Sequence, residues 1–391
     1  MKSRRSLAIL FAIVFVDLVG FGMVIPVMPL YAERLGASNA WTGLLSTGYS
    51  LMQFIFAPIW GRWSDRIGRR PVLLGSIAMT AVAFAMYGMA SSFTWLLVSR
   101  LFAGAATANI AIAQAYVADV TPPEGRARGM GLIGAAFGLG FVLGPAIGGL
   151  LSQHSLGLPG FAAAGLSALN LVAAWFILPE PEHLAKAIRR PRFEAMRAEL
   201  ARPGIRRLLL CYFLVILAFS GMEATYAFLA RHRVGLTERG VSYAFTYIGV
   251  LLVIVQGGLV GPLTRKFGEK RLLVAGIALQ AVALAMLPFV GNLPGLLIAT
   301  APLAVGSGLS NPAISALISR QSRAEDQGGT LGIGQSAAAC GRILGPESGT
   351  FTYDRHSPAA AYLIGATLMV LAAIVGSTVR GKEPNPAVEG G

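Results

Sequence analysis

The chain has 391 residues, of which 55% are hydrophobic and only 13% are charged, and its mean hydropathy is +0.65. Soluble domains carry about 25% charged residues, so this chain has too few charges to cover a soluble globule of its size. The formal net charge is +14, but the basic residues fall in short patches between apolar runs. That distribution is typical of a membrane protein and argues against nucleic acid as a partner.

The first apolar run follows a basic N-terminus and reaches about Tyr31. It contains Asp17 and two prolines, is too long for a secretory signal, and lacks a good cleavage site, so we interpret it as the first membrane span. About 20 apolar residues cross a bilayer as a helix. On this basis twelve spans are predicted, at roughly 7–31, 41–60, 71–90, 93–117, 129–151, 160–179, 207–230, 241–262, 271–290, 293–318, 329–350 and 358–379.

The distribution of lysine and arginine predicts the orientation of these spans. With both termini in the cytoplasm, 25 of the 32 basic residues fall in cytoplasmic segments and five fall in outside loops. This bias predicts a multi-pass protein of a bacterial inner membrane with both ends inside. The longest polar stretch, 180–206, is predicted to be a cytoplasmic linker with a short surface helix near 192–201. It separates an N-terminal six-helix half, 1–179, from a C-terminal half, 207–391, that ends in a short tail.

The two halves repeat each other at an offset of about 200 residues. GRWSDRIGRR at 61–70 aligns with GPLTRKFGEK at 261–270, and GPAIG at 144–148 aligns with GPESG at 345–349. Two matches at nearly one offset indicate a duplication. Two parallel halves in a membrane predict a transport pathway between them that opens alternately to each side.

Three segments carry unusual chemistry for a membrane protein. Residues 61–74 form a glycine-bounded loop with Asp65 among arginines. Arg100 lies within the fourth span, where a charge is costly and marks a functional site unless it extends to the headgroups. Span five carries a stripe of small residues that permits close helix packing, and a proline that kinks the helix. We assign to that packing Gly140, Gly144, Pro145 and Gly148.

These segments, with DLVGFGMVIPVMP at 17–29, resemble the major facilitator superfamily, and within it the twelve-span drug:H+ antiporter group. LMQFIFAPIWGRWSDRIGRRPVLL and GAAFGLGFVLGPAIGG are similar to the tetracycline efflux proteins. The resemblance implies an all-α fold of two pseudo-symmetric six-helix halves. It also implies a conformational latch made by Asp65, Arg69 and Asp119, a proton-coupling role for Asp17 and Arg100, and a cavity position for Gln53.

One departure concerns span nine, which carries an acidic residue in tetracycline exporters. Here 272–290 has no carboxylate, whereas span seven has Glu223 and span eleven has Arg342. Burial raises the pKa of a carboxyl group and a nearby arginine lowers it, so a carboxylate whose surroundings alternate can carry protons. We therefore add Glu223 to the predicted proton-coupling residues. For Asp17, a polar contact between helices stays an alternative to proton coupling.

The remaining candidates for the substrate cavity are polar or aromatic residues within spans. Each amide alone is more often a helix–helix hydrogen bond than a ligand contact, the tyrosine could instead face lipid, and the arginine could bind an anionic group of a substrate. They are Asn109, Gln114, Tyr226, Gln256, Asn311, Gln335 and Arg342.

Together these features predict a proton-coupled antiporter that exports small amphiphilic or drug-like molecules, tetracycline-like or multidrug. A metabolite exporter or a proton-linked importer on the same fold stays an alternative, as does a non-transporting membrane receptor. The chain has no HExxH, GxSxG or GxxxxGK[ST] motif, and its histidines are not spaced for a metal, so we expect no enzyme, no metal and no cofactor beyond the proton. The expected partners are a small-molecule substrate and membrane lipid, with the chain a monomer.

Overall fold

The computed structural model describes residues 2–107, 109–120, 123–180, 202–322 and 327–379, and within these ranges the regular structure is all helical. The chain divides into two compact units, Met1–Ala187 with Ala224–Val250, and Ile188–Glu223 with Leu251–Gly391. The predicted limits of the two halves stay predictions, because residues 181–201 of the linker, which include the whole of its predicted surface helix near 192–201, and the tail after residue 379 lie outside the described residues.

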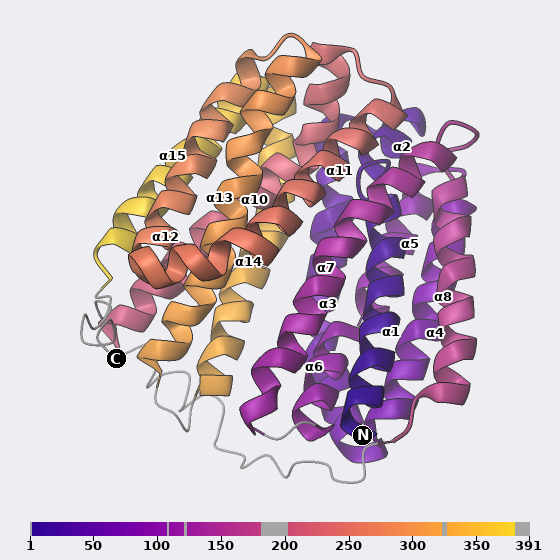
Figure 1. Cartoon of the computed structure of the whole chain (residues 1–391). Coiled ribbons are helices and arrows are strands. Elements are labelled where there is room, and N and C mark those ends of the chain that lie inside the picture. Colours follow the sequence, from indigo (N-terminus) through magenta and orange to yellow (C-terminus); the bar gives the residue numbers. More distant parts are fainter. Residues whose placement is uncertain (1, 108, 121–122, 181–201, 323–326, 380–391) are drawn as a thin grey trace. The chain divides into compact units, whose positions relative to one another are not determined.

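The first unit begins with eight helices (Figure 1). α1 packs against α7 and α8, α4 against α5 and α8, and α3 against α5. Their bounds are α1 (Lys2–Val24), α2 (Met28–Arg34), α3 (Asn39–Ile67), α4 (Arg69–Gly88), α5 (Phe93–Ala106), α6 (Asn109–Val120), α7 (Pro123–Leu151) and α8 (Leu158–Ile177).

The C-terminal part of the chain continues with longer helices, shown in pink to yellow in Figure 1. In the second unit α12 packs against α13 and α15, and α14 against α13 and α15. A five-residue π-helix, η1, interrupts the run from α11 to α12. The bounds are α10 (Pro203–Val234), α11 (Glu238–Ile254), η1 (Val255–Leu259), α12 (Val260–Met286), η2 (Leu287–Phe289), α13 (Leu293–Gln321), α14 (Gln327–Arg355) and α15 (Pro358–Ser377).

The helices differ from the predicted spans where the backbone breaks. The first span divides at residues 25–27, beside Pro26, and the fourth divides after Ala106. Conversely, the eighth and ninth spans form one helical run, Glu238–Phe289, whose continuity is interrupted at Gly268, with φ 76° and ψ 159°. A positive φ at this position favours glycine, so Gly268 ends one span and starts the next.

Among the described residues, nine helical runs are long and apolar enough to cross a membrane. The run Glu238–Phe289 holds two of the twelve predicted spans. The other two, α3 and α14, are each 29 residues long but are interrupted by polar and charged residues and are not among these nine runs. Since polar residues inside a span are concentrated where helices face protein or water, this polarity is compatible with membrane insertion.

Each unit by itself contains the same glycine contact between helices. In the first, a Cβ added at Gly144 on α7 would lie 2.7 Å from the Cα of Gly22 on α1. In the second, a Cβ added at Gly349 on α14 would lie 2.6 Å from the Cα of Gly221 on α10. The sequence repeat is therefore also a repeat of helix packing, with the backbones in direct contact in both units.

The start of one helix in each unit repeats as well. Ser92 Oγ accepts a hydrogen bond from the backbone N–H of Trp95 at 3.2 Å and caps α5. Two hundred positions later, Asn292 Oδ1 accepts one from Gly295 at 2.8 Å and caps α13. Serine and asparagine both stabilise a helix start in this way, so the duplication keeps the cap while the residue changes.

Candidate functional site

The loop between α3 and α4 holds a buried arginine at the centre of a charge cluster. Arg69 Nη1 lies 2.6 Å from Oδ1 of Asp65, and Arg69 Nε lies 2.8 Å from Oδ2 of Asp119. The same Nη1 donates to Ser64 Oγ at 2.6 Å. The side chains of Arg69 and Asp119 are 8% and 3% exposed, whereas that of Asp65 is 45% exposed. The three residues predicted as a latch thus meet in space, and their role in transport stays a prediction.

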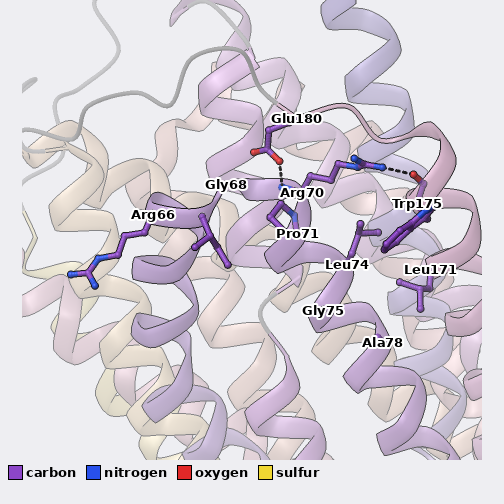
Figure 2. A pocket seen from close by; sticks show the side chains of 11 residues that line it. Arg66, Gly68, Arg70, Pro71, Leu74, Gly75, Ala78, Leu171, Trp175 and Glu180 are labelled. Carbon is purple, nitrogen blue, oxygen red and sulfur yellow. Dashed lines mark hydrogen bonds between the residues drawn. The ribbon is translucent and has the colours of Figure 1, made fainter.

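A second acidic residue, Glu180, fixes the backbone of this loop. It follows α8, and its carboxylate accepts hydrogen bonds from the backbone N–H of Arg69 at 2.6 Å and of Arg70 at 2.9 Å (Figure 2). The carboxylate thereby caps α4, whose start favours negative charge. Gly68 makes this approach possible, because its φ is 106° and an added Cβ would lie 2.8 Å from Glu180 Oε1. Glu180 was not among the predicted site residues.

The second unit contains the counterpart of the Arg69–Asp119 pair with the charges exchanged. Arg320 Nη2, near the end of α13, lies 2.6 Å from Oε1 of Glu269, which follows Gly268. Glu269 is 8% exposed. Position 269 aligns with Arg69 in the repeat, and Arg320 lies 201 positions after Asp119. The repeat aligns the two loops, but this ion pair was not predicted. The offset of 200 leads from Asp119 to Ser319, one residue before Arg320, so the repeat points to the neighbourhood of the pair and not to the pair itself.

The predicted helix-packing residues line the contact between α7 and α1. An added Cβ would lie 2.7 Å from Leu18 Cβ at Gly140 and 2.3 Å from the carbonyl oxygen of Met23 at Gly148. Pro145 lies within α7. These distances leave no room for a side chain, so α1 and α7 pack backbone against backbone over two turns or more.

Asp17 is buried in the middle of α1, with 7% of its surface exposed. It forms no ion pair with the described residues. Its polar neighbour is Asn109 at the start of α6, which is fully buried and whose two side-chain polar atoms make no hydrogen bond of standard geometry. A buried carboxyl group beside an unsatisfied amide is costly, and such groups are usually retained for a function.

Arg100 on α5 is also buried, with 3% exposure. Its guanidinium lies over the ring of Tyr49, 4.7 Å from the centroid, in a cation–π contact, and it forms no ion pair with the described residues. Its Nε is buried without a hydrogen-bond partner. This arginine therefore does not extend to a surface, the alternative considered from sequence, and it keeps a donor available for a carboxylate, a substrate or water.

Among the remaining candidates, Glu223 on α10 and Arg342 on α14 are near enough to interact electrostatically within the second unit. Tyr226 is fully buried, with its ring 5.2 Å from that of Phe245. The other five amides are partly or fully exposed, and two of them bond to neighbours. Asn311 donates to Ser307 Oγ at 3.1 Å, and Gln335 donates to Tyr212 OH at 3.4 Å. The remaining three are Gln53 on α3, Gln114 on α6 and Gln256 in η1.

A further charged cluster joins α2 to the end of α10 and the start of α11. Glu238 Oε1 accepts from Arg34 Nη2 at 3.0 Å and from Arg231 Nη1 at 3.2 Å, and Glu33 Oε1 lies 3.2 Å from Nε2 of His232. We call these five residues the α2–α10–α11 cluster. None of these five residues was among the predicted site residues, because they are not related by the sequence repeat and no local spacing in the sequence pairs them.

The arrangement defines a class of protein. Two units with repeated helix packing, repeated caps and repeated loop geometry, and with buried charges inside apolar helices, are characteristic of a membrane transporter rather than of an enzyme.

Comparison with known proteins gives the family. The Major Facilitator Superfamily profile matches residues 10–261 and 208–390. The class C tetracycline resistance protein of Escherichia coli is 32% identical over 384 residues, which are 95% of this chain and 96% of that protein. Multidrug resistance protein 2 of Bacillus subtilis is 27% identical over 364 residues, 90% of each. The chain belongs to the Major Facilitator Superfamily.

Solved structures agree with this fold. The crystal structure of the human organic anion transporter MFSD10 (TETRAN) is similar with a TM-score of 0.73 and 25% identity, covering 96% of this chain and all of that one. The nucleoside transporter NupG has a TM-score of 0.81 at 13% identity, covering 96% and 100%. The predicted family, the all-helical fold and the absence of an enzymatic role are thereby confirmed. The chain is a multi-pass membrane transporter of small molecules.

Proposed function

We propose that the protein is a proton-coupled antiporter that exports small amphiphilic or drug-like molecules by alternating access. The observation that carries this proposal is Asp17, a buried carboxyl group within a membrane helix that has no ion pair among the described residues and lies beside Asn109. Such a group changes its proton affinity when its access to water changes, which is what coupling to protons requires.

The proposed substrate class and direction rest on relatives. Proteins named for tetracycline and multidrug resistance align over nearly the whole chain, and resistance is consistent with export. The proposed location is the bacterial plasma membrane with both termini inside, because basic residues concentrate in the segments that this orientation places in the cytoplasm.

A second candidate, export of organic anions, is favoured by Arg100. Its buried guanidinium has a free Nε and no ion pair with the described residues, and an arginine is well suited to bind a carboxylate. The human relative of known structure is described as an organic anion transporter. The coupling ion is the same in both candidates, so the charge of the substrate distinguishes them.

Everted vesicles with an acid interior, reported by a pH-sensitive dye, test both candidates. We expect dye recovery when tetracycline or another amphiphilic compound is added, and no recovery in Asp17→Asn. The exposed carboxylate Asp354 supplies the matched control, since Asp354→Asn removes an equal charge outside the spans. Recovery with anionic compounds alone would support the second candidate, and the absence of recovery with cationic, neutral and anionic panels would overturn proton antiport.

A further inference from the structure

A groove runs along the surface of the first unit between α4 and α8 (Figure 2). Its volume is about 960 Å³. One end is polar and is formed by Arg66, Arg70 and Glu180, whereas the rest is apolar. The apolar walls come from one stripe on each helix, namely Pro71, Leu74, Gly75 and Ala78 on α4, and Leu171 and Trp175 on α8.

The α4 stripe contains two small residues, Gly75 and Ala78. A Cβ added at Gly75 would meet no atom within 4 Å, so the space above this glycine is open. Residues 71, 74, 75 and 78 lie on one face of the helix. The stripe therefore forms an apolar channel about 10 Å long, which fits a hydrocarbon chain.

The polar end lies at the boundary of the spans. The apolar helices begin at Arg69 in α4 and end at Ile177 in α8, so the two span ends meet beside the groove. Trp175 is 58% exposed there, and tryptophan concentrates at the depth of lipid headgroups. The apolar channel consequently extends from headgroup depth into the hydrocarbon region.

The three charged side chains at the polar end differ in how far their hydrogen-bonding groups have partners. Arg70 donates from Nη2 to the backbone oxygen of Trp175 at 2.5 Å, but its Nε is buried and has no partner. Arg66 is exposed and forms no ion pair with the described residues, and Figure 2 shows it extending to the side opposite Arg70. Glu180 is occupied by two backbone N–H groups of α4. The groove therefore has a net positive end, at which one guanidinium nitrogen of Arg70 is without a hydrogen-bond partner.

We propose that this groove binds one anionic phospholipid. Its phosphodiester meets Arg70, with Arg66 adding to the positive potential, and one acyl chain lies over Gly75 and Ala78. Arginine binds phosphate well, and a lipid satisfies the apolar walls and the cationic end together. A free phosphate would leave the channel empty, and a zwitterionic lipid would bring the same phosphodiester together with a cationic group that the positive end repels. This inference rests on the membrane setting of the helices and is independent of the coupling ion and the transported substrate.

Native mass spectrometry of the purified full chain tests the proposal, with lipid retention measured after incubation with phosphatidylglycerol or phosphatidylcholine. We expect one phosphatidylglycerol per chain to resist delipidation. Gly75→Leu fills the channel and Arg70→Gln removes the donor, and each should lower the retained fraction about tenfold. The matched controls are Gly165→Leu, which adds the same side chain in open space on α8, and Arg62→Gln, which removes an equal charge outside the groove.

The outcomes separate the possible ligands. Equal retention of the two lipids would overturn the assignment of an anionic headgroup, and so would displacement of the bound lipid by inorganic phosphate alone. If both groove variants retain as much phosphatidylglycerol as the wild type, or if the control variants lose as much as the groove variants, the lipid does not bind in this groove. Elution volume and melting temperature of each variant establish that it is folded, and because Gly75→Leu and Arg70→Gln act on different parts of the groove, failure of one to fold leaves the other as the test.

Discussion

Arg320 and Glu269 form a 2.6 Å ion pair that mirrors the pair of Arg69 with Asp119 in the other unit, with the two charges exchanged. Both pairs place one residue directly after a positive-φ glycine, Gly68 or Gly268. The backbone of the loop is thus repeated while the sign of its charge is reversed. Electrostatic attraction does not depend on which partner is positive, so both arrangements stabilise the same geometry.

The first prediction follows from this reversal. Asp119→Arg places two cations together at a buried site and should destabilise the protein by roughly 3 kcal/mol or more. The triple variant Asp65→Arg, Arg69→Glu, Asp119→Arg copies the charges at positions 265, 269 and 320 and should recover most of the lost stability. Melting temperatures in detergent measure both. A triple variant as unstable as the single one would contradict the equivalence of the loops.

The second prediction concerns the contact of α7 with α1. Gly144→Ala introduces a Cβ 2.7 Å from the Cα of Gly22 and should destabilise the protein by about 1–3 kcal/mol through overpacking. Gly134→Ala, on the same helix, meets no atom within 4 Å and should be neutral or slightly stabilising. The two variants are compared by thermal unfolding, and equal melting temperatures would show that α7 can move away from α1 without cost.

The third prediction tests the cap that Glu180 provides. Glu180→Ala removes the acceptor of the Arg69 and Arg70 backbone N–H groups and should lower the stability of this helix start by about 1 kcal/mol. Hydrogen exchange of these two amides should accelerate about fivefold, since exchange reports local opening. The amide of Trp95, capped by Ser92, is the internal control and should not change. Acceleration at all three amides would indicate general destabilisation instead.

The fourth prediction concerns the α2–α10–α11 cluster. The double variant Glu33→Gln, Glu238→Gln removes both carboxylates of the cluster. These carboxylates make four contacts with Arg34, Arg231 and His232. Because these side chains are partly exposed, the loss should be about 1 kcal/mol and should be smaller in high salt. Hydrogen exchange in residues 31–37 and 231–238 measures it. A difference between wild type and variant that persists undiminished in 1 M salt would argue against an electrostatic contact.

The fifth prediction addresses Glu223, whose charged neighbour is Arg342. If Glu223 carries protons, Glu223→Gln should abolish the substrate-induced proton release that is expected of wild-type vesicles, because the amide does not titrate in the working pH range. Asp354→Asn again serves as the control for loss of one carboxylate. Transport with unchanged dependence on pH in Glu223→Gln would remove this residue from the coupling mechanism.

Much of the fold could be predicted from sequence because a membrane imposes a simple rule, a long apolar helix for each crossing. The positions at which helices break or bend were harder to predict. The single helical run through Gly268 hides a span boundary behind one glycine, and the π-helix at 255–259 has no simple sequence signature. Hydropathy measures apolar character over many residues and does not detect where one residue changes the path of the backbone.

The residues of the candidate site could also be predicted only in part. Asp65, Arg69 and Asp119 were grouped by resemblance, and the structure brings them together. Glu180 was missed because it lies more than 100 positions from the loop that it caps. A cap made by a distant side chain depends on how helices pack, and no local spacing in a sequence encodes it.

The reversed ion pairs also bear on how the two repeats can evolve. Duplicated segments are exposed to recombination, which tends to copy one repeat over the other. Here such copying of residues 261–270 onto 61–70 would place Glu beside Asp119 and Arg at position 65, so the buried Asp119 would lose its arginine partner and face an acidic group instead. The cost of that unpaired buried charge would select against the exchange. The opposite polarity of the two loops therefore acts as a barrier that keeps the halves of the gene distinct.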